Sequence, residues 1–194
     1  MDEPLRKRLL SLTAEDARVR AALAATGELY RGYAPRMAEV HDRNAAELDE
    51  ILERHGWPGR SLVGDDGVAA AWLVVQHAIG QPALQRRVLP LLRAATADGE
   101  APAAHAAYLE DRICFYEERP QRYGTQLTWD DAGQLVPWRL GEPPRVDELR
   151  RSVGLGTLAA RLAEARRETA DEPRPGDVAA WRAAARAWAR SVGW

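Results

Sequence analysis

Four polar side chains fall where two predicted helices should be apolar, and their imidazole and carboxamide groups are the ones best suited to chemistry. In the segment 35–55, His41 and Asn44 lie on an otherwise apolar stripe whose three- and four-residue spacings define one helix face. Gln76 and His77 follow an apolar run that is typical of a buried helix. Burying such groups without partners costs about 1–3 kcal/mol each, so we expect them to bond to one another.

The chemistry of this cluster would be general acid–base catalysis, because the ordinary pKa of histidine lies near neutrality. A further helix, predicted over residues 102–118, carries Tyr108, Asp111 and Arg112 close together on one face. Asp111 could orient an imidazole, and Arg112 could hold an anion. The pattern predicts a polar pocket between three helices for a small polar or anionic ligand, and the candidate catalytic residues are His41, His77 and Asp111.

The same polar groups also have a purely structural interpretation. A network of buried polar side chains can stabilise one particular core without binding any ligand. Two classes of function therefore remain open: a small-molecule-binding or enzymatic domain, and a non-catalytic interaction or regulatory module. The sequence identifies no cofactor for either class.

Metal binding and nucleophilic catalysis have weaker support in the sequence. His41, His77 and Asp111 match the composition of a two-histidine, one-carboxylate site. No helix carries a His-Glu-x-x-His pattern, however, and we assign no metal from the sequence. Cys114 lies on a mostly apolar helix turn, where a buried thiol is usually inert. No Gly-x-Ser-x-Gly motif is present either.

A glycine-rich loop is predicted at residues 56–67, which contain four glycines. Arg60 lies in this loop shortly before a predicted helix, so the loop could receive an anion. The Gly-Lys-Ser/Thr of a phosphate-binding loop is missing, and no strand precedes the loop. The alternative is a tight helix-to-helix turn pinned by Trp57.

The hydrophobic periodicity predicts a mainly α fold, with helices over residues 3–26, 35–55, 68–79, 82–97, 102–118, 144–153, 157–169 and 177–191. The apolar 68–79 helix should be the buried centre of a compact multi-helix domain. Two short β-like runs flank an Asp/Gly turn and predict a small β-hairpin near 121–138. We expect a single domain over 1–170, a linker at 171–176 and an amphipathic helix within 177–194.

The overall composition excludes several classes of protein. The 194 residues are 46% hydrophobic and 29% charged, which is typical of a globular chain. A net charge of −2 provides no basic excess for nucleic acid. One cysteine permits no intramolecular disulfide. No signal peptide is visible and no apolar stretch approaches the roughly 20 residues of a membrane span, so we expect a cytoplasmic location.

The segment 177–194 carries a tryptophan stripe beside several arginines. Trp181, Ala185 and Trp188 fall on one face of the predicted helix. This face could pack on its own domain, on a second copy in a homo-oligomer, or in the groove of another protein. Tryptophan and arginine also suit a membrane surface.

Four motifs resemble an uncharacterised bacterial family, known as a domain of unknown function. They are Gly-Trp-Pro-Gly-Arg-Ser-Leu-Val-Gly at 56–64, Ala-Trp-Leu-Val-Val-Gln-His-Ala at 71–78, Tyr-Leu-Glu-Asp-Arg at 108–112 and Gln-Arg-Tyr-Gly-Thr-Gln at 121–126. The resemblance covers about residues 33–160. It implies a helical domain closed by the Tyr-Gly-Thr-Gln segment, without an established activity.

The last of these motifs draws attention to Tyr123 and Gln126, which could line a pocket wall together with Arg122. The alternative is an ordinary hairpin that covers the helices. With these additions, the candidate ligand-binding residues are Asn44, Arg60, Gln76, Tyr108, Arg112, Tyr123 and Gln126.

Overall fold

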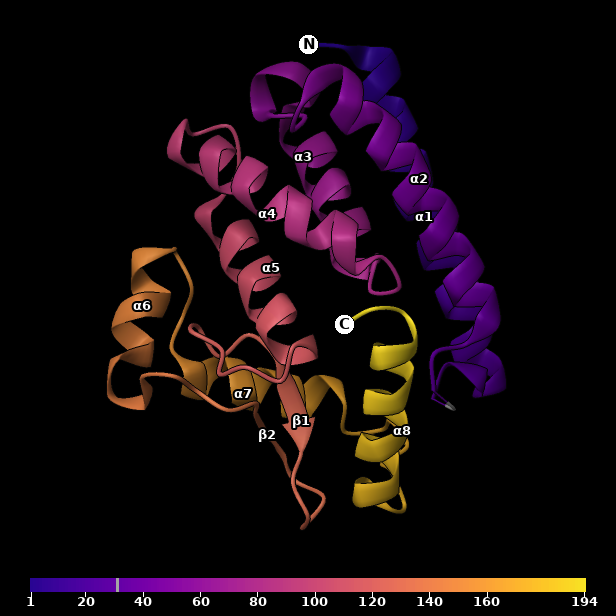
Figure 1. Ribbon diagram of the computed structural model, residues 1–194, viewed down its shortest axis with the longest axis vertical. Coiled ribbons are helices and arrows are strands. Elements are labelled where there is room, and N and C mark those ends of the chain that lie inside the picture. Colours follow the sequence, from indigo (N-terminus) through magenta and orange to yellow (C-terminus); the bar gives the residue numbers. More distant parts are fainter. Residues whose placement is uncertain (31) are drawn as a thin grey trace. The chain divides into compact units, whose positions relative to one another are not determined.

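The computed structural model describes residues 1–30 and 32–194, and it is mainly α-helical with one small hairpin, as predicted (Figure 1). The helices are α1 (Glu3–Thr26), α2 (Pro35–His55), α3 (Arg60–His77), α4 (Pro82–Ala97), α5 (Ala103–Tyr116), α6 (Val146–Ser152), α7 (Leu158–Glu168) and α8 (Val178–Ser191). The strands are β1 (Leu127–Trp129) and β2 (Leu135–Pro137), and 3-10 turns lie at Glu28–Tyr30 and Pro143–Arg145. Contacts group the chain into a first unit, Met1–His105, and a second unit, Ala106–Trp194, each described by itself.

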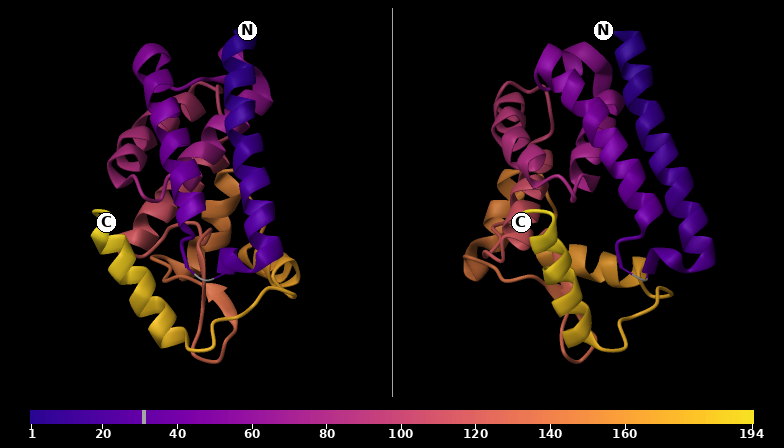
Figure 2. Two further views of the ribbon diagram at one scale, coloured as in Figure 1. Left: turned by 90° about the vertical axis from the view of Figure 1, so that its right-hand side faces the viewer. Right: turned by 45° about the vertical axis from the view of Figure 1, so that its right-hand side comes forward.

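Helices α1 and α2 of the first unit run alongside each other (Figure 2) and have the predicted bounds. The side chain of Asp2 accepts a hydrogen bond from the backbone N–H of Leu5, and α1 ends at Gly27 in the left-handed conformation. A cluster of buried apolar residues joins the two helices: Val19, Leu23, Ala34, Met37 and Val40. This packing fixes which residues of α1 face those of α2.

Helix α3 begins at Arg60, well before the predicted start at residue 68, so the predicted loop over 56–67 is wrong from residue 60 onward. A first helical turn ends at Gly64, whose φ of 72° and ψ of 172° are not helical, and the helix then continues. Gly67 packs so tightly that an added Cβ would lie 2.7 Å from the Cβ of Val63. The glycines that predicted a loop therefore allow a kink and a close packing contact.

The hairpin of the second unit is narrower than the predicted 121–138. Antiparallel pairing runs from Leu127 opposite Pro137 to Trp129 opposite Leu135. The carboxylate of Asp130 accepts hydrogen bonds from two backbone N–H groups in the turn, which is the Asx-turn chemistry expected there. Residues 122–126 of the first predicted run form no strand.

Helix α8 packs within the second unit through its C-terminal end. The ring of Tyr116 lies 6.0 Å from that of Trp188 and stacks on Trp194 at 4.9 Å, measured between ring centroids. Trp181 is 37% exposed, and Ala189 is the buried residue of this helix. Among the described helices, none is long and apolar enough to cross a membrane.

The first unit contains a stacked tryptophan–histidine pair. The rings of Trp72 and His105 lie 4.4 Å apart with an interplanar angle of 10°, and Trp72 Nε1 donates a hydrogen bond to the carbonyl oxygen of His105 at 3.2 Å. Burial lowers the pKa of His105 to about 4. The stacked imidazole is therefore neutral at physiological pH.

This stack predicts a specific pH dependence of stability. Because the pKa of His105 is lower in the folded chain than in the unfolded chain, the unfolded chain binds more protons between about pH 6.5 and pH 4. Acidification through this window should lower the free energy of unfolding by on the order of 1–3 kcal/mol through His105 alone. Urea denaturation of wild type and His105→Phe across this range measures the contribution of His105 to the free energy of unfolding, since phenylalanine keeps the stack without titrating. Identical pH profiles for both proteins would contradict the assignment.

Candidate metal centre

One buried carboxylate of the first unit faces two imidazoles that come from two other helices. Asp16 Oδ2 of α1 lies 3.0 Å from His41 Nε2 of α2 and 2.8 Å from His77 Nδ1 of α3. The three potential ligand atoms all lie within 4.8 Å of one another. The structure thus brings the two predicted histidines together, with 5.1 Å between their ring centroids.

Asp16 is the residue that sequence reasoning missed, although the sequence carries a signal for it. The buried stripe of α1 follows spacings of four and three residues through Leu5, Leu9, Leu12, Asp16, Val19 and Leu23. A carboxylate at one position of such an apolar stripe is a buried charge that needs partners. Its side chain is only 7% exposed, and the two imidazoles are those partners.

The ring of His41 is held from behind by Tyr33. The hydroxyl of Tyr33 is hydrogen-bonded to His41 Nδ1 at 2.8 Å, and the two rings are stacked with centroids 5.7 Å apart. On the other side of the ring, Nε2 is buried and lies near Asp16 without forming a hydrogen bond of acceptable geometry. When Nδ1 carries the proton and donates a hydrogen bond to the Tyr33 hydroxyl, the lone pair of Nε2 faces the carboxylate.

The carboxylate of Asp16 is ionised at neutral pH. Burial alone would raise the pKa of Asp16, but the contacts with His41 and His77 outweigh it and hold this pKa below its ordinary value. Access is asymmetric, because the side chain of His77 is 28% exposed whereas that of His41 is 10% exposed. Of the three side chains, that of His77 is therefore the most accessible to solvent.

Of the two predicted amides, Asn44 is tied to the helix that carries Asp16, whereas Gln76 is buried and precedes His77 in the sequence. Asn44 lies one turn after His41 on α2, and its Nδ2 donates a hydrogen bond to the carbonyl oxygen of Leu12 on α1 at 3.0 Å. That carbonyl lies one turn before Asp16, so Asn44 holds α2 against α1 beside the centre. Gln76 is buried next to His77.

Asp111 belongs to the second unit and binds backbone amides. Its carboxylate accepts hydrogen bonds from the backbone N–H groups of Arg122, Tyr123 and Thr125 at 2.8–3.1 Å, and from the Thr125 hydroxyl at 3.1 Å. Burial raises the pKa of Asp111, and these hydrogen bonds oppose the rise. The carboxylate predicted to orient an imidazole therefore fixes the loop before the hairpin.

The remainder of that loop is equally well fixed. The side chain of Gln121 donates to the carbonyl oxygens of Gln126 and Trp138 and accepts from the backbone N–H of Gln126. Gly124 has a φ of +66°, and an added Cβ would lie 2.9 Å from a methyl group of Leu158. Tyr123 is buried against Ala107 and Leu149. These contacts give Tyr123 and Gln121 a structural role in the loop, and a ligand contact of Gln126 stays a prediction.

The two predicted anion-binding arginines have protein contacts in the structure. Arg60 pairs with Asp65 at 2.5 Å, and its Nη1 donates to the carbonyl oxygen of Gly99. The backbone N–H of Ser61, at the start of α3, binds the carboxylate of Glu100 at 2.7 Å, so the chain supplies its own anion there. Burial lowers the pKa of Arg112, and Tyr116 opposes the effect.

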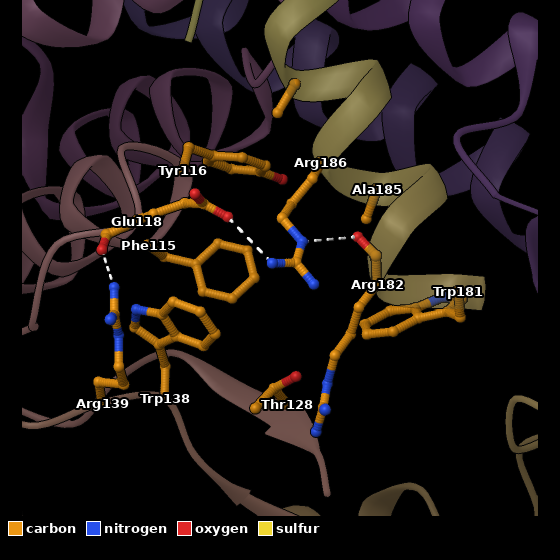
Figure 3. A pocket seen from close by; sticks show the side chains of 11 residues that line it. Phe115, Tyr116, Glu118, Thr128, Trp138, Arg139, Trp181, Arg182, Ala185 and Arg186 are labelled. Carbon is orange, nitrogen blue, oxygen red and sulfur yellow. Dashed lines mark hydrogen bonds and ion pairs between the residues drawn. The ribbon is translucent and has the colours of Figure 1, made fainter. Parts of the chain in front are cut away.

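A separate hollow of about 330 Å³ lies within the second unit (Figure 3). Phe115 and Trp138 form one wall, and α8 forms the opposite wall. Arg186 reaches from α8 to the carboxylate of Glu118 at 3.6 Å, and Arg139 donates to the backbone carbonyl of the same residue. Its charged groups are thus paired within the chain, and we assign no ligand to this hollow.

Comparison with protein families decides the membership of the chain. A model described as a family of unknown function, DUF6624, matches residues 3–166. The chain belongs to this family. The match confirms the resemblance to a family of unknown function, and it includes Asp16, His41 and His77 while α8 lies beyond it. No curated protein and no solved structure matches the chain significantly.

The contacts of Asp111 predict a large stability effect. Asp111→Asn removes the ionised acceptor that binds three backbone amides, and hydrogen bonds to charged groups contribute about 1.5–3 kcal/mol each. We expect the free energy of unfolding to fall by roughly 2–4 kcal/mol in urea denaturation. Asp98→Asn, at an exposed position, is the matched control and should change it by less than about 0.5 kcal/mol. Equal stability of the two variants would refute a structural role of Asp111.

Proposed function

We propose that the first unit is a metal-dependent catalytic domain whose divalent transition-metal ion is bound by Asp16, His41 and His77. The observation that carries this proposal is the convergence of two imidazole nitrogens on one buried carboxylate oxygen, one of them, His41 Nε2, without a hydrogen bond. A buried ring nitrogen of this kind needs a partner. A metal ion at the centre would bind it.

The distances support metal coordination. Bonds of about 2.0–2.2 Å from an ion to nitrogen and oxygen ligands place neighbouring ligand atoms about 3.0–3.4 Å apart for angles between 90° and 109°. The carboxylate oxygen of Asp16 lies 3.0 Å from His41 Nε2 and 2.8 Å from His77 Nδ1. The three ligand atoms lie within 4.8 Å of one another, so side-chain rotation that brings the two imidazole nitrogens closer together would admit the ion.

The types of ligand support a particular group of ions. Two imidazoles with one carboxylate suit zinc, iron, cobalt, nickel or copper, whereas magnesium and calcium prefer sites made of oxygen ligands. Structural zinc sites generally have four protein ligands, and catalytic zinc sites have three plus a water. Three ligands with the solvent-exposed side at His77 therefore favour an ion that binds water or substrate.

The chain's own residues then have defined tasks. Asp16 would supply negative charge to the ion, and when His41 Nδ1 donates the hydrogen bond to the Tyr33 hydroxyl, Nε2 is free to bind the ion. The ion would supply Lewis acidity and lower the pKa of bound water. We further propose that the substrate is a small polar or anionic molecule and that the protein acts in the cytoplasm.

The second candidate function is metal-free general-base catalysis by His77, and one observation favours it. The 2.8 Å contact from Asp16 to His77 Nδ1 is the pairing that leaves Nε2 of a histidine as a general base. His77, partly exposed, would then remove a proton from substrate or water. The interaction-module alternative depends on the exposed face of α8, and a ligand-binding first unit does not exclude it.

The direct test is a metal titration of the full chain. Protein freed of metal with a chelator is titrated with Zn²⁺, Co²⁺ and Fe²⁺ by calorimetry, and we expect one ion per chain. His77→Ala should weaken binding by more than about 100-fold, because changes in groups behind the ligands already cost 10–100-fold. His55→Ala, at an exposed position on α2, is the matched control and should bind as wild type.

Three outcomes separate the candidates. Saturable binding that His77→Ala abolishes and His55→Ala preserves supports the metal site. Visible absorption bands of bound Co²⁺ that disappear in the same variant support it independently of affinity. A protein that binds none of these ions refutes the metal site and leaves the Asp16–His77 pair as the remaining candidate.

Tyr33 provides a finer test of the site. Tyr33→Phe removes the hydroxyl that orients His41 but keeps the stacked ring, so we expect metal affinity to fall about 10-fold with the 1:1 ratio unchanged. Tyr30→Phe, which changes a more exposed tyrosine nearby in the sequence, is the control. Wild-type affinity of Tyr33→Phe would show that the hydroxyl does not position His41.

A further inference from the structure

A second hollow of the second unit is lined by an unusual number of arginines. It has a volume of about 370 Å³ and is lined by residues of α6, α7 and the segment between them, together with Tyr108. Arg150, Arg161 and Arg167 line it, and Glu164 is the carboxylate among its lining residues. Glu168 also pairs with Arg161, so the three guanidinium groups exceed the two carboxylates by one positive charge.

Arg150 is the most deeply buried of these arginines, at 2% exposed. Its Nε donates to the carbonyl oxygen of Gly156 at 2.5 Å, and its Nη1 donates to that of Tyr123 at 2.8 Å. Carbonyl oxygens satisfy donors without neutralising the charge. Among the residues that the structure describes, no carboxylate lies within ion-pair distance of Arg150.

The more distant acids near Arg150 have other partners. The Asp111 carboxylate accepts from backbone amides, and that of Asp147 accepts from the backbone N–H of Leu158 at 2.7 Å. Burial lowers the pKa of Arg150, and although these acids oppose the effect, the charge of Arg161 adds to it. Burying a cation without a close counter-charge is costly, so a bound anion would stabilise this arrangement.

The other lining groups are suited to the same ligand. Arg167 lies exposed at the hollow, with no ion pair to any described residue. The hydroxyl oxygen of Thr157 accepts from the backbone N–H of Ala160 at 3.2 Å, which leaves the hydroxyl proton available for donation. Arg161 is held in place by Glu164 and Glu168, each at 3.0 Å.

We propose that this hollow binds a small phosphate monoester between Arg150, Arg161 and Arg167. Guanidinium groups bind phosphate oxygens in pairs, and the negative charge of a phosphate monoester, between about −1.5 and −2 at neutral pH, complements the excess positive charge of this hollow. The volume lies near the lower end of the roughly 300–1,000 Å³ of small-molecule sites, which favours a small ligand over a macromolecule. The inference concerns a site of the second unit and does not depend on the proposed metal centre.

In the experiment, glycerol phosphate, inorganic phosphate and acetate are titrated into the full chain. Calorimetry and amide NMR measure the binding of each probe. We expect one glycerol phosphate per chain, at least as tight as inorganic phosphate and at least 10-fold tighter than acetate. The double variant Arg161→Gln/Arg167→Gln should weaken binding at least 10-fold, and Arg190→Gln, at an exposed position on α8, should not.

Thermal melting separates folding from binding in these variants, since both arginines of the double variant lie at least partly exposed on α7. A double variant that melts near wild type but no longer binds phosphate supports the site. The proposal is overturned if neither phosphate probe binds, if acetate binds as tightly as glycerol phosphate, or if Arg190→Gln weakens binding as much as the double variant.

Discussion

The ionised carboxylate of Asp16 constrains how the first three helices can pack. It replaces an apolar residue on the inner face of α1, where an uncompensated charge would cost several kcal/mol. The imidazole of His41 from α2 and that of His77 from α3 meet it there. Each partner comes from a different helix, so these contacts fix which turns of the three helices face one another. The same contacts assemble the groups that could hold a metal ion.

Two buried charges of opposite sign, Asp111 and Arg150, bind the backbone of one loop in the second unit. Asp111 binds the backbone N–H groups of residues 122, 123 and 125, and Arg150 binds the carbonyl oxygen of Tyr123. The Tyr-Gly-Thr-Gln segment is thereby fixed by side chains from α5 and α6 instead of by strand pairing. Two family-like motifs that are distant in the sequence, Tyr-Leu-Glu-Asp-Arg and Gln-Arg-Tyr-Gly-Thr-Gln, form one structural element.

Features that depend on residues close together in the sequence were predictable, whereas those that depend on residues distant in the sequence were not. The bounds of α1 and α2 follow from local signals, namely Pro35, Gly27 and Gly56, and they were predicted correctly. The inward position of His41 follows from helix periodicity, and that of His77, whose side chain is 28% exposed, was predicted from the apolar run before it. The same periodicity on α1 places Asp16 on the apolar stripe, so its burial was predictable as well. The binding of Asp111 to backbone amides was not predictable, because periodicity identifies a face of a helix and not the loop that packs on it. The early start of α3 depends on how Gly64 and Gly67 pack, which a glycine-rich sequence does not reveal.

The most direct test of the account is a crystal structure of the Zn²⁺- or Co²⁺-soaked full chain, with anomalous diffraction recorded on both sides of the metal absorption edge. We predict one anomalous peak about 2.0–2.2 Å from His41 Nε2, His77 Nδ1 and an Asp16 carboxylate oxygen. Tyr33 should remain hydrogen-bonded to His41 Nδ1. An anomalous map without a peak at these three residues, while Asp16 and the imidazoles stay in direct contact, would contradict it.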